Sequence, residues 1–403
     1  MQGNSFDIVL KISERCNLAC PYCYYYFQEF SSESKSRLIT EEVIAELPRF
    51  LKRSAERLNL ERINIVLHGG EPLLIKPKKA DKICQLISDE LRGLVDVTFA
   101  VQTNGVLISE EWIDVFKKHN IIVGVSIDGL PEVHDKLRPD LKGKGSFQRT
   151  LKGYRLLDEM MGDNPTHGAL GVLHLSDEED KMLAYMIDEL GVPSPNLNFP
   201  RGGWDSDDAV KFGQSIENHR KLIRHYLDNY VHPKYRFVRG ITGHIFSLMS
   251  DEGAEEVDYR ASCRHNIATI SSEGDVYIDD NILGLDDSFS ADILNIFDDS
   301  SLKDLVTGPL WTELMEAIDD VPAECGECEW FRSCRGGDLF NRFSEKRRFN
   351  NKSVMCDTIK MFHEEIVNYL VKNRVCTLEE IADRLSKTPT DSSRERLASM
   401  LQQ

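Results

Sequence analysis

The stretch FDIVLKISERCNLACPYC, residues 6–23, joins an apolar run to three closely spaced cysteines. Residues 6–12 are rich in β-branched side chains, which is typical of a buried strand. Cys16, Cys20 and Cys23 follow it, with three and then two residues between them. A structural zinc site usually takes four protein ligands, whereas three thiolates suit a cubane iron–sulfur cluster that keeps one iron open. The stretch therefore predicts a strand that delivers three cluster ligands at its end.

Composition limits the classes of protein that the chain can belong to. Its 403 residues predict one large domain and a smaller one. The net charge of −18 argues against nucleic acid as a partner, because phosphate binding depends on Lys and Arg. No apolar run is long enough to cross a bilayer, so we expect no membrane partner. Ten cysteines without a visible export signal predict a cytoplasmic protein whose clustered thiols bind metal.

The first half of the chain alternates strand and helix patterns. Helical patterns occupy residues 40–58, 78–93 and 109–119. Thr40 and Ser109, the first residues of two of these ranges, are the expected N-cap residues. This alternation predicts an α/β fold with a parallel sheet, in the form of a partial (β/α)6 barrel similar to a TIM barrel. Apolar runs that predict further buried strands lie at residues 63–69, 97–103, 121–127, 167–173 and 195–199.

Polar residues follow three of these strands directly. The sequences are HGGEP (68–72), QTNG (102–105) and SIDG (126–129). Taken singly, Asn-Gly and Asp-Gly are also common turn dipeptides. Because barrel enzymes place their chemistry at the carboxyl ends of the strands, we expect these groups to meet the three cysteines at one mouth.

The cysteine motif resembles that of the radical S-adenosylmethionine (SAM) superfamily, and the three strand-end motifs lie where that superfamily binds its cofactor. The resemblance implies that Cys16, Cys20 and Cys23 hold a [4Fe–4S] cluster whose open iron chelates SAM. Reduction of SAM would then give a 5′-deoxyadenosyl radical that abstracts a hydrogen atom.

The same resemblance assigns roles to individual residues. Gly69, Gly70 and Glu71 would line the site of the methionyl amine, Arg138 would pair with the carboxylate, and Tyr22 would lie near the adenine. A guanidinium suits a carboxylate because it donates two parallel hydrogen bonds. The full set of SAM-binding residues that the resemblance implies is Tyr22, Gly69, Gly70, Glu71, Thr103, Asn104, Ser126, Asp128 and Arg138.

The C-terminal half has four further clustered cysteines, Cys325, Cys328, Cys334 and Cys356. On spacing alone, zinc and a second iron–sulfur cluster both remain open. The region resembles a SPASM domain, the iron–sulfur extension with a β-hairpin and helices that is found on peptide-modifying radical SAM enzymes. That resemblance implies one auxiliary [4Fe–4S] cluster on these four thiols.

The usual SPASM pattern has seven cysteines, and this sequence departs from it twice. Asp279 and Asp338 stand where two ligands of a further auxiliary cluster would lie, and Cys263 remains alone. We therefore expect two clusters rather than three.

Shorter motifs, such as NFPRGGWD (198–205), resemble maturases of ribosomally made peptides, and in particular the cyclophane (triceptide) synthases. These enzymes join an aromatic ring carbon to the β-carbon of a nearby residue. An anaerobic sulfatase-maturing type, which forms formylglycine, is the alternative. A non-catalytic iron–sulfur or zinc protein that binds a partner is the alternative of another class.

Both enzyme reactions need a proton acceptor, because a carbon radical that loses an electron must also lose a proton. Asp280 aligns with the general base of the sulfatase-maturing enzymes, and Asp279 and Asp338 are further candidates. Solvated turn carboxylates are an equally good interpretation of these residues.

We expect a radical SAM barrel with a bridging helix over residues 1–235, a SPASM-like domain over 236–362 and a helical extension over 363–403. Residues 364–386 have the apolar spacing of two amphipathic helices. The resemblance implies a precursor peptide as substrate and an electron donor such as flavodoxin or ferredoxin.

Overall fold

The computed structural model describes residues 4–25, 37–161, 167–174, 178–231, 237–238, 240–249, 266–290 and 293–386. Its centre is a nine-stranded sheet in the order β6-β5-β4-β3-β2-β1-β7-β8-β9. Neighbouring strands from β6 to β7 are parallel, and β8 and β9 are antiparallel to their neighbours. The strands are β1 (Ser5–Ser13), β2 (Arg62–Gly69), β3 (Asp96–Thr103), β4 (Ile122–Ser126), β5 (His167–Val172), β6 (Asn196–Asn198), β7 (Ile267–Ile270), β8 (Asp275–Ile278) and β9 (Leu294–Asn295).

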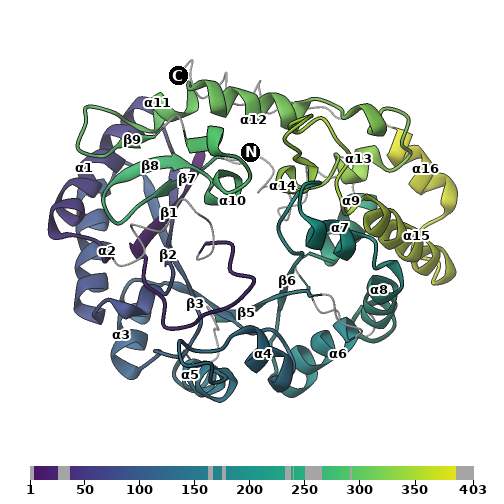
Figure 1. Cartoon of the computed structure of the whole chain (residues 1–403), viewed down its shortest axis with the longest axis horizontal. Helices are drawn as coiled ribbons and strands as arrows, with labels where there is room; N and C mark the ends of the chain where they lie inside the picture. The colour runs from purple at the N-terminus through teal and green to yellow at the C-terminus, as the bar shows by residue number, and fades with distance from the viewer. Residues whose placement is uncertain are drawn as a thin grey trace.

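The six strands that the apolar runs predict are β1 to β6, and the prediction of a partial α/β barrel is confirmed. Figure 1 shows the strands curving around a central space with the helices outside them. The helices of this part are α1 (Glu41–Leu58), α2 (Pro77–Leu91), α3 (Glu110–Lys118), α4 (Pro131–Leu137), α5 (Phe147–Met161), α6 (Glu179–Ala184), α7 (Asp207–Gly213), α8 (Ile216–Tyr230) and α9 (Thr242–Met249).

Local sequence explains where these helices begin. The Thr40 side chain accepts a hydrogen bond from Val43 N, and that of Ser109 accepts one from Trp112 N. Both predicted N-caps are therefore confirmed, and each satisfies a backbone donor that has no partner within the helix.

Strand β1 carries apolar side chains on one face and polar ones on the other, because successive side chains in a strand alternate. Phe6, Ile8 and Leu10 are fully buried, and Phe6 stacks on Trp311 of α12 with the ring centroids 5.7 Å apart. Lys11 has the opposite orientation and is equally buried, so β1 carries a cation into the barrel.

The C-terminal part continues the barrel sheet. The predicted hairpin is β7–β8, and β7 pairs with β1, which the sequence did not predict. Its helices are α10 (Asp280–Leu283), α11 (Leu302–Val306), α12 (Pro309–Asp319), α13 (Phe331–Cys334), α14 (Leu339–Arg342), α15 (Cys356–Lys372) and α16 (Leu378–Ser386). The last two helices are the predicted amphipathic pair, and α15 packs against α8 and α9 (Figure 1).

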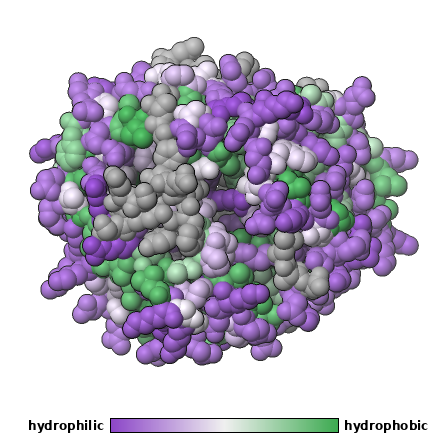
Figure 2. Space-filling view, in the orientation of Figure 1, coloured by the Kyte–Doolittle hydropathy of each residue, from purple (hydrophilic) through white to green (hydrophobic). Residues whose placement is uncertain are grey.

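The face in Figure 2 is mostly hydrophilic, with hydrophobic residues in scattered groups. Among the described residues, no helix is both long enough and apolar enough to cross a membrane.

Candidate active site

The three-cysteine loop leaves the carboxyl end of β1 and is held by backbone hydrogen bonds. Cys23 N donates to Cys20 O at 3.1 Å, and Ala19 N donates to Pro139 O at 2.8 Å. Burial raises the pKa of Cys16 to about 12 and that of Cys20 to about 11. Thiols that resist ionisation in this way need a cationic group beside them to act as thiolate ligands. The donor set therefore fits an iron–sulfur group chemically.

Two glycines bring the end of β2 against this loop. A Cβ atom on Gly69 would lie 1.9 Å from Ser13 O, and one on Gly70 would lie 2.5 Å from Arg15 O. Gly69 also has a φ of 134°, which an L-residue rarely adopts. Any larger side chain would therefore push the second strand away from the cysteine loop.

Glu71 follows the glycines and ties β2 to the end of β3. Its carboxylate is fully buried and accepts hydrogen bonds from Leu73 N (3.0 Å), Thr103 Oγ1 (2.7 Å) and Asn104 N (2.8 Å). Burial raises the pKa of Glu71 to about 7, against the opposing effect of these donors. Asn104 also donates to Asn17 Oδ1 at 2.7 Å, which connects β3 to the cysteine loop.

A second buried carboxylate, Asp128, lies past β4. Arg138 donates to it through Nε (2.8 Å) and Nη2 (3.2 Å), and Tyr22 donates its hydroxyl at 2.6 Å. Burial is the largest single effect and raises the pKa of Asp128, but Arg138 and His174 together outweigh it and hold the pKa well below its usual range. Ser126 accepts a hydrogen bond from Gln102 Nε2 at 2.9 Å. The predicted SAM residues thus gather at the strand ends, while their individual roles stay predictions.

Lys11 lies at the centre of a third polar group, which we call the lysine cluster: Lys11, His68 and Asp280. Its Nζ makes an ion pair with Asp280 Oδ2 and lies 3.2 Å from His68 Nδ1. His68 is the residue of β2 that pairs with Lys11 of β1, so the sheet register creates this contact. Burial is the largest single effect and raises the pKa of Asp280, but Lys11, His68 and Arg201 together outweigh it and keep the pKa below its usual value.

His68 is neutral in this arrangement. Burial first, and the Lys11 ammonium second, lower its pKa to about 3. Because an ammonium can only donate, Nδ1 is the acceptor and Nε2 carries the ring proton. Asp279, beside Asp280, accepts a hydrogen bond from Asn281 N at 3.0 Å and caps α10. Burial and the Asp280 charge raise the pKa of Asp279 to about 6.

Two aromatic residues and an arginine complete the mouth. Tyr24 donates its hydroxyl to Asp280 Oδ2 at 3.3 Å, and the Tyr25 ring centroid lies 4.3 Å from Lys11 Nζ. The guanidinium of Arg201, three residues after β6, lies 3.8 Å from the centroid of the Tyr24 ring.

Lys11 and Arg201 were not predicted from the sequence as residues of the site. The signal for Lys11 was a single charge inside the apolar run FDIVLKI. Arg201 had only a weak signal, its place directly after the last barrel strand.

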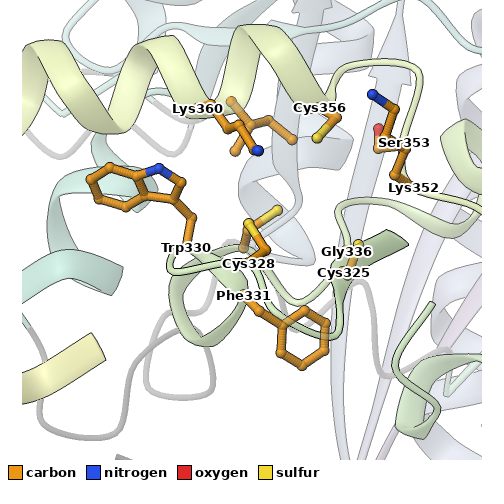
Figure 3. Close-up of a pocket in the computed structure, with 11 residues that line it drawn as sticks. Cys325, Cys328, Trp330, Phe331, Gly336, Lys352, Ser353, Cys356 and Lys360 are labelled. Atoms are coloured by element: carbon orange, nitrogen blue, oxygen red, sulfur yellow. The ribbon is translucent and has the colours of Figure 1, made fainter. Parts of the chain in front are cut away.

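The four C-terminal cysteines line one pocket (Figure 3), which also contains Trp330, Phe331, Ile359, Lys352 and Lys360. Burial, and then the charges of the other three cysteines, raise the pKa of Cys325 to about 11. Four thiolates therefore need a shared cationic group here, and the donor set suits zinc or a cluster.

Metal ligation stays a prediction at both cysteine sites. Within the part of the chain that the structure describes, no three His, Cys, Asp or Glu side chains are gathered as they would be around a single metal ion. Asp338 is the N-cap residue of α14, two residues after Gly336 of the four-cysteine pocket, whereas Asp279 and Asp280 lie at the mouth. Cys263 lies outside the described residues.

Comparison with known proteins agrees with this geometry. Residues 10–186 match the radical SAM superfamily. The chain is 23% identical over 381 residues to the cysteine-type anaerobic sulfatase-maturating enzyme of Clostridium novyi (strain NT), which is 91% of this chain and 96% of that enzyme. Native anSMEcpe with bound AdoMet has a TM-score of 0.74 at 20% identity, over 94% of this chain and 99% of its own.

Streptococcus suis SuiB, solved with its precursor peptide SuiA, has a TM-score of 0.58 at 17% identity over 88% of this chain and 76% of its own. The fold and the strand-end site thus define a SPASM-type α/β barrel. The chain therefore carries a radical SAM enzyme domain over residues 10–186, and this superfamily uses a [4Fe–4S] cluster and SAM. The non-catalytic alternative is therefore wrong.

Proposed function

We propose that this enzyme is a peptide maturase that oxidises a side chain of a ribosomally made peptide. The observation that carries the proposal is Asp280, a buried carboxylate that Lys11 holds at the barrel mouth, next to Tyr24 of the cysteine loop. When bound, the cluster and SAM supply a hydrogen-abstracting radical. Cys16, Cys20 and Cys23 would hold the cluster, and the buried residues of β2, β3 and β4 would hold SAM.

Asp280 has the properties of a proton acceptor for this oxidation. When two hydrogens are removed, the peptide would lose one hydrogen atom to the radical derived from SAM, one proton to the base and one electron to an iron–sulfur cluster. Because Lys11, His68 and Arg201 together lower the pKa of Asp280, its carboxylate is ionised at neutral pH and can accept the proton. Asp279 is a weaker candidate, since its carboxylate already accepts a hydrogen bond as the cap of α10.

Two products are compatible with this chemistry. The first is a cyclophane-type bond between an aromatic ring carbon and a β-carbon, which the maturase-like motifs favour. The second is formylglycine, which the similarity to a sulfatase-maturating enzyme along almost the whole chain favours at least as well. Both need the same hydrogen abstraction and the same base.

We also propose that Cys325, Cys328, Cys334 and Cys356 hold one auxiliary [4Fe–4S] cluster, so that the enzyme has two clusters. The shared pocket and the mutual effect of these thiols on their pKa values support this assignment. The division at residues 235 and 362, the electron donor and the cytoplasmic location stay predictions.

The test is an anaerobic incubation with reductant, SAM and two kinds of peptide. One kind is the Kp18Cys and Cp18Cys peptides that anSMEcpe binds in its structures. The other is the candidate precursors encoded beside the gene for this chain. Loss of two hydrogens without reaction with an aldehyde trap supports a crosslink, and a trapped aldehyde supports formylglycine. SAM cleavage with no change in either kind of peptide would contradict the proposal.

A further inference from the structure

Arg201 is a cation at the barrel mouth that makes no ion pair with any other residue that the structure describes. It lies directly past β6, and its guanidinium stacks at 3.8 Å from the Tyr24 ring centroid and 6.0 Å from that of Phe340. Lys11, another cation of the mouth, is neutralised by its ion pair with Asp280. The positive charge of Arg201 acts to lower the pKa of both Asp279 and Asp280, against the effect of burial, so Arg201 lies near them. No carboxylate of the described residues lies within ion-pair distance of it.

The Nη1 atom of Arg201 is buried and has no hydrogen-bond partner among the described residues. A buried donor without a partner destabilises a protein by about 1–3 kcal/mol, and more if it is charged. Stacking on Tyr24 does not satisfy it, because a cation–π contact uses the face of the guanidinium while the N–H groups point outward in its plane. The edge of the guanidinium therefore remains available to a ligand.

The backbone beside Arg201 is held firmly in place. Gly202 O accepts a hydrogen bond from Asn341 Nδ2 at 2.8 Å, and Trp204 N donates to Phe343 O at 2.8 Å. Gly203 packs so closely that a Cβ atom there would lie 2.1 Å from Phe343 O. A residue fixed in this way loses little conformational entropy when it binds a ligand.

We propose that Arg201 binds a carboxylate of the peptide substrate, either an Asp or Glu side chain or a free C-terminus. A guanidinium suits this group because its parallel N–H donors match the two carboxylate oxygens. The proposal rests on the proposed function, since it takes a peptide to be the substrate. It adds that the peptide carries a negative charge beside the residue that is modified.

The experiment measures binding rather than turnover. Three acetylated peptides, Ac-GATYGDAG-NH2, Ac-GATYGNAG-NH2 and Ac-GATYGNAG-OH, are titrated calorimetrically into the anaerobically reconstituted, SAM-bound enzyme. The first peptide has a side-chain carboxylate, the second has no carboxylate, and the third has a C-terminal carboxylate. We expect one or both acidic peptides to bind about 10- to 100-fold more tightly than the neutral one, as a hydrogen-bonded ion pair would provide.

The variants are Arg201→Met and Arg201→Gln, with Arg49→Met as control, because Arg49 is an exposed arginine of α1. The preference should vanish in both Arg201 variants and persist in the control. Iron content and thermal unfolding show whether each variant folds. If an Arg201 variant does not fold, the comparison of the three peptides on the wild-type enzyme still tests the proposal.

Equal binding of the three peptides to the wild type, no binding of any of them, or a preference that survives in a folded Arg201 variant would overturn the proposal. These outcomes differ from a failure of the proposed function. An enzyme that prefers acidic peptides but never modifies a peptide contradicts only the proposed function, and one that modifies peptides without this preference contradicts only the carboxylate site.

Discussion

The two cysteine sites differ in what surrounds them. The three cysteines after β1 lie among buried charged groups, with Asp128 and Arg138 on one side and the lysine cluster on another. The four C-terminal cysteines lie in a pocket whose wall is made mainly by Trp330, Phe331 and Ile359, with Lys352 and Lys360 as its charged residues. A site short of one ligand and rich in charged groups is suited to binding and chemistry, whereas a complete ligand set beside apolar side chains is suited to electron transfer or stability.

Removing the three-cysteine site should have the largest effect. A triple Cys16, Cys20 and Cys23→Ala variant should abolish SAM cleavage and lower the iron content from about eight to about four per chain, because only one four-iron cluster would remain. Iron analysis and a 5′-deoxyadenosine assay on anaerobically reconstituted protein measure both. Cys84→Ala, a buried thiol of α2, is the control and should change neither.

SAM cleavage that survives in the triple variant would contradict the assignment of the reactive site. About twelve irons in the wild type would mean that Asp279 and Asp338 do not mark a lost cluster.

Asp280→Asn should have the next largest effect, on peptide oxidation alone. A positioned general base contributes about 10²–10⁴-fold, so product formation should fall by that factor while SAM cleavage continues. Product mass analysis measures the first and 5′-deoxyadenosine the second. Asp279→Asn is the control at the neighbouring position, because the asparagine side chain can still cap α10. If product formation fell equally in this variant, Asp279 rather than Asp280 would be the general base.

Lys11→Met tests whether the lysine cluster holds Asp280 ionised. Breaking a buried ion pair costs about 3–5 kcal/mol, because an unpaired charge remains. In the wild type, the lowered pKa of Asp280 makes its contribution to stability present above pH 4 or so and lost as the pH falls further. In the variant, burial, the largest effect on that pKa, is opposed only by the weaker effects of His68 and Arg201, so the pKa should be raised and stability should instead fall as the pH rises.

Thermal unfolding from about pH 2 to pH 8 measures this change of sign, because the wild-type loss falls between the lowered pKa of Asp280 and its usual value. Lys52→Met removes an exposed ion pair with Glu90 and should cost at most about 1 kcal/mol without changing the pH profile. An unchanged profile in Lys11→Met would show that Lys11 does not control Asp280.

The sequence predicted the parts of the molecule that depend on neighbours along the chain. Strand β1 and the cysteine loop follow from one apolar run and three cysteines, and the N-caps Thr40 and Ser109 follow from the residue types that begin helices. The polar residues after β2, β3 and β4 could be assigned to one mouth because parallel strands end on the same side.

The lysine cluster could not be predicted in this way. Lys11 meets His68 because of the register between β1 and β2, and it meets Asp280 because β7 and β8 extend the same sheet. The position of Arg201 depends on contacts of its loop with Asn341 and Phe343 in the C-terminal part. Such contacts between distant segments leave no periodic pattern in the sequence.

Disrupting the four-cysteine site should have the smallest effect on the chemistry of the mouth. A Cys325 and Cys328→Ser variant should lose about four irons and some thermal stability, yet retain SAM cleavage, because the predicted SAM-binding residues lie in the barrel, around the ends of β1 to β4. Iron and zinc analysis with the 5′-deoxyadenosine assay measures this. If the wild type instead holds one zinc that the variant loses, the C-terminal site is structural. If SAM cleavage disappears together with the C-terminal irons in a variant that still folds, the two sites are coupled, and the contrast between a reactive and a supporting cluster is wrong.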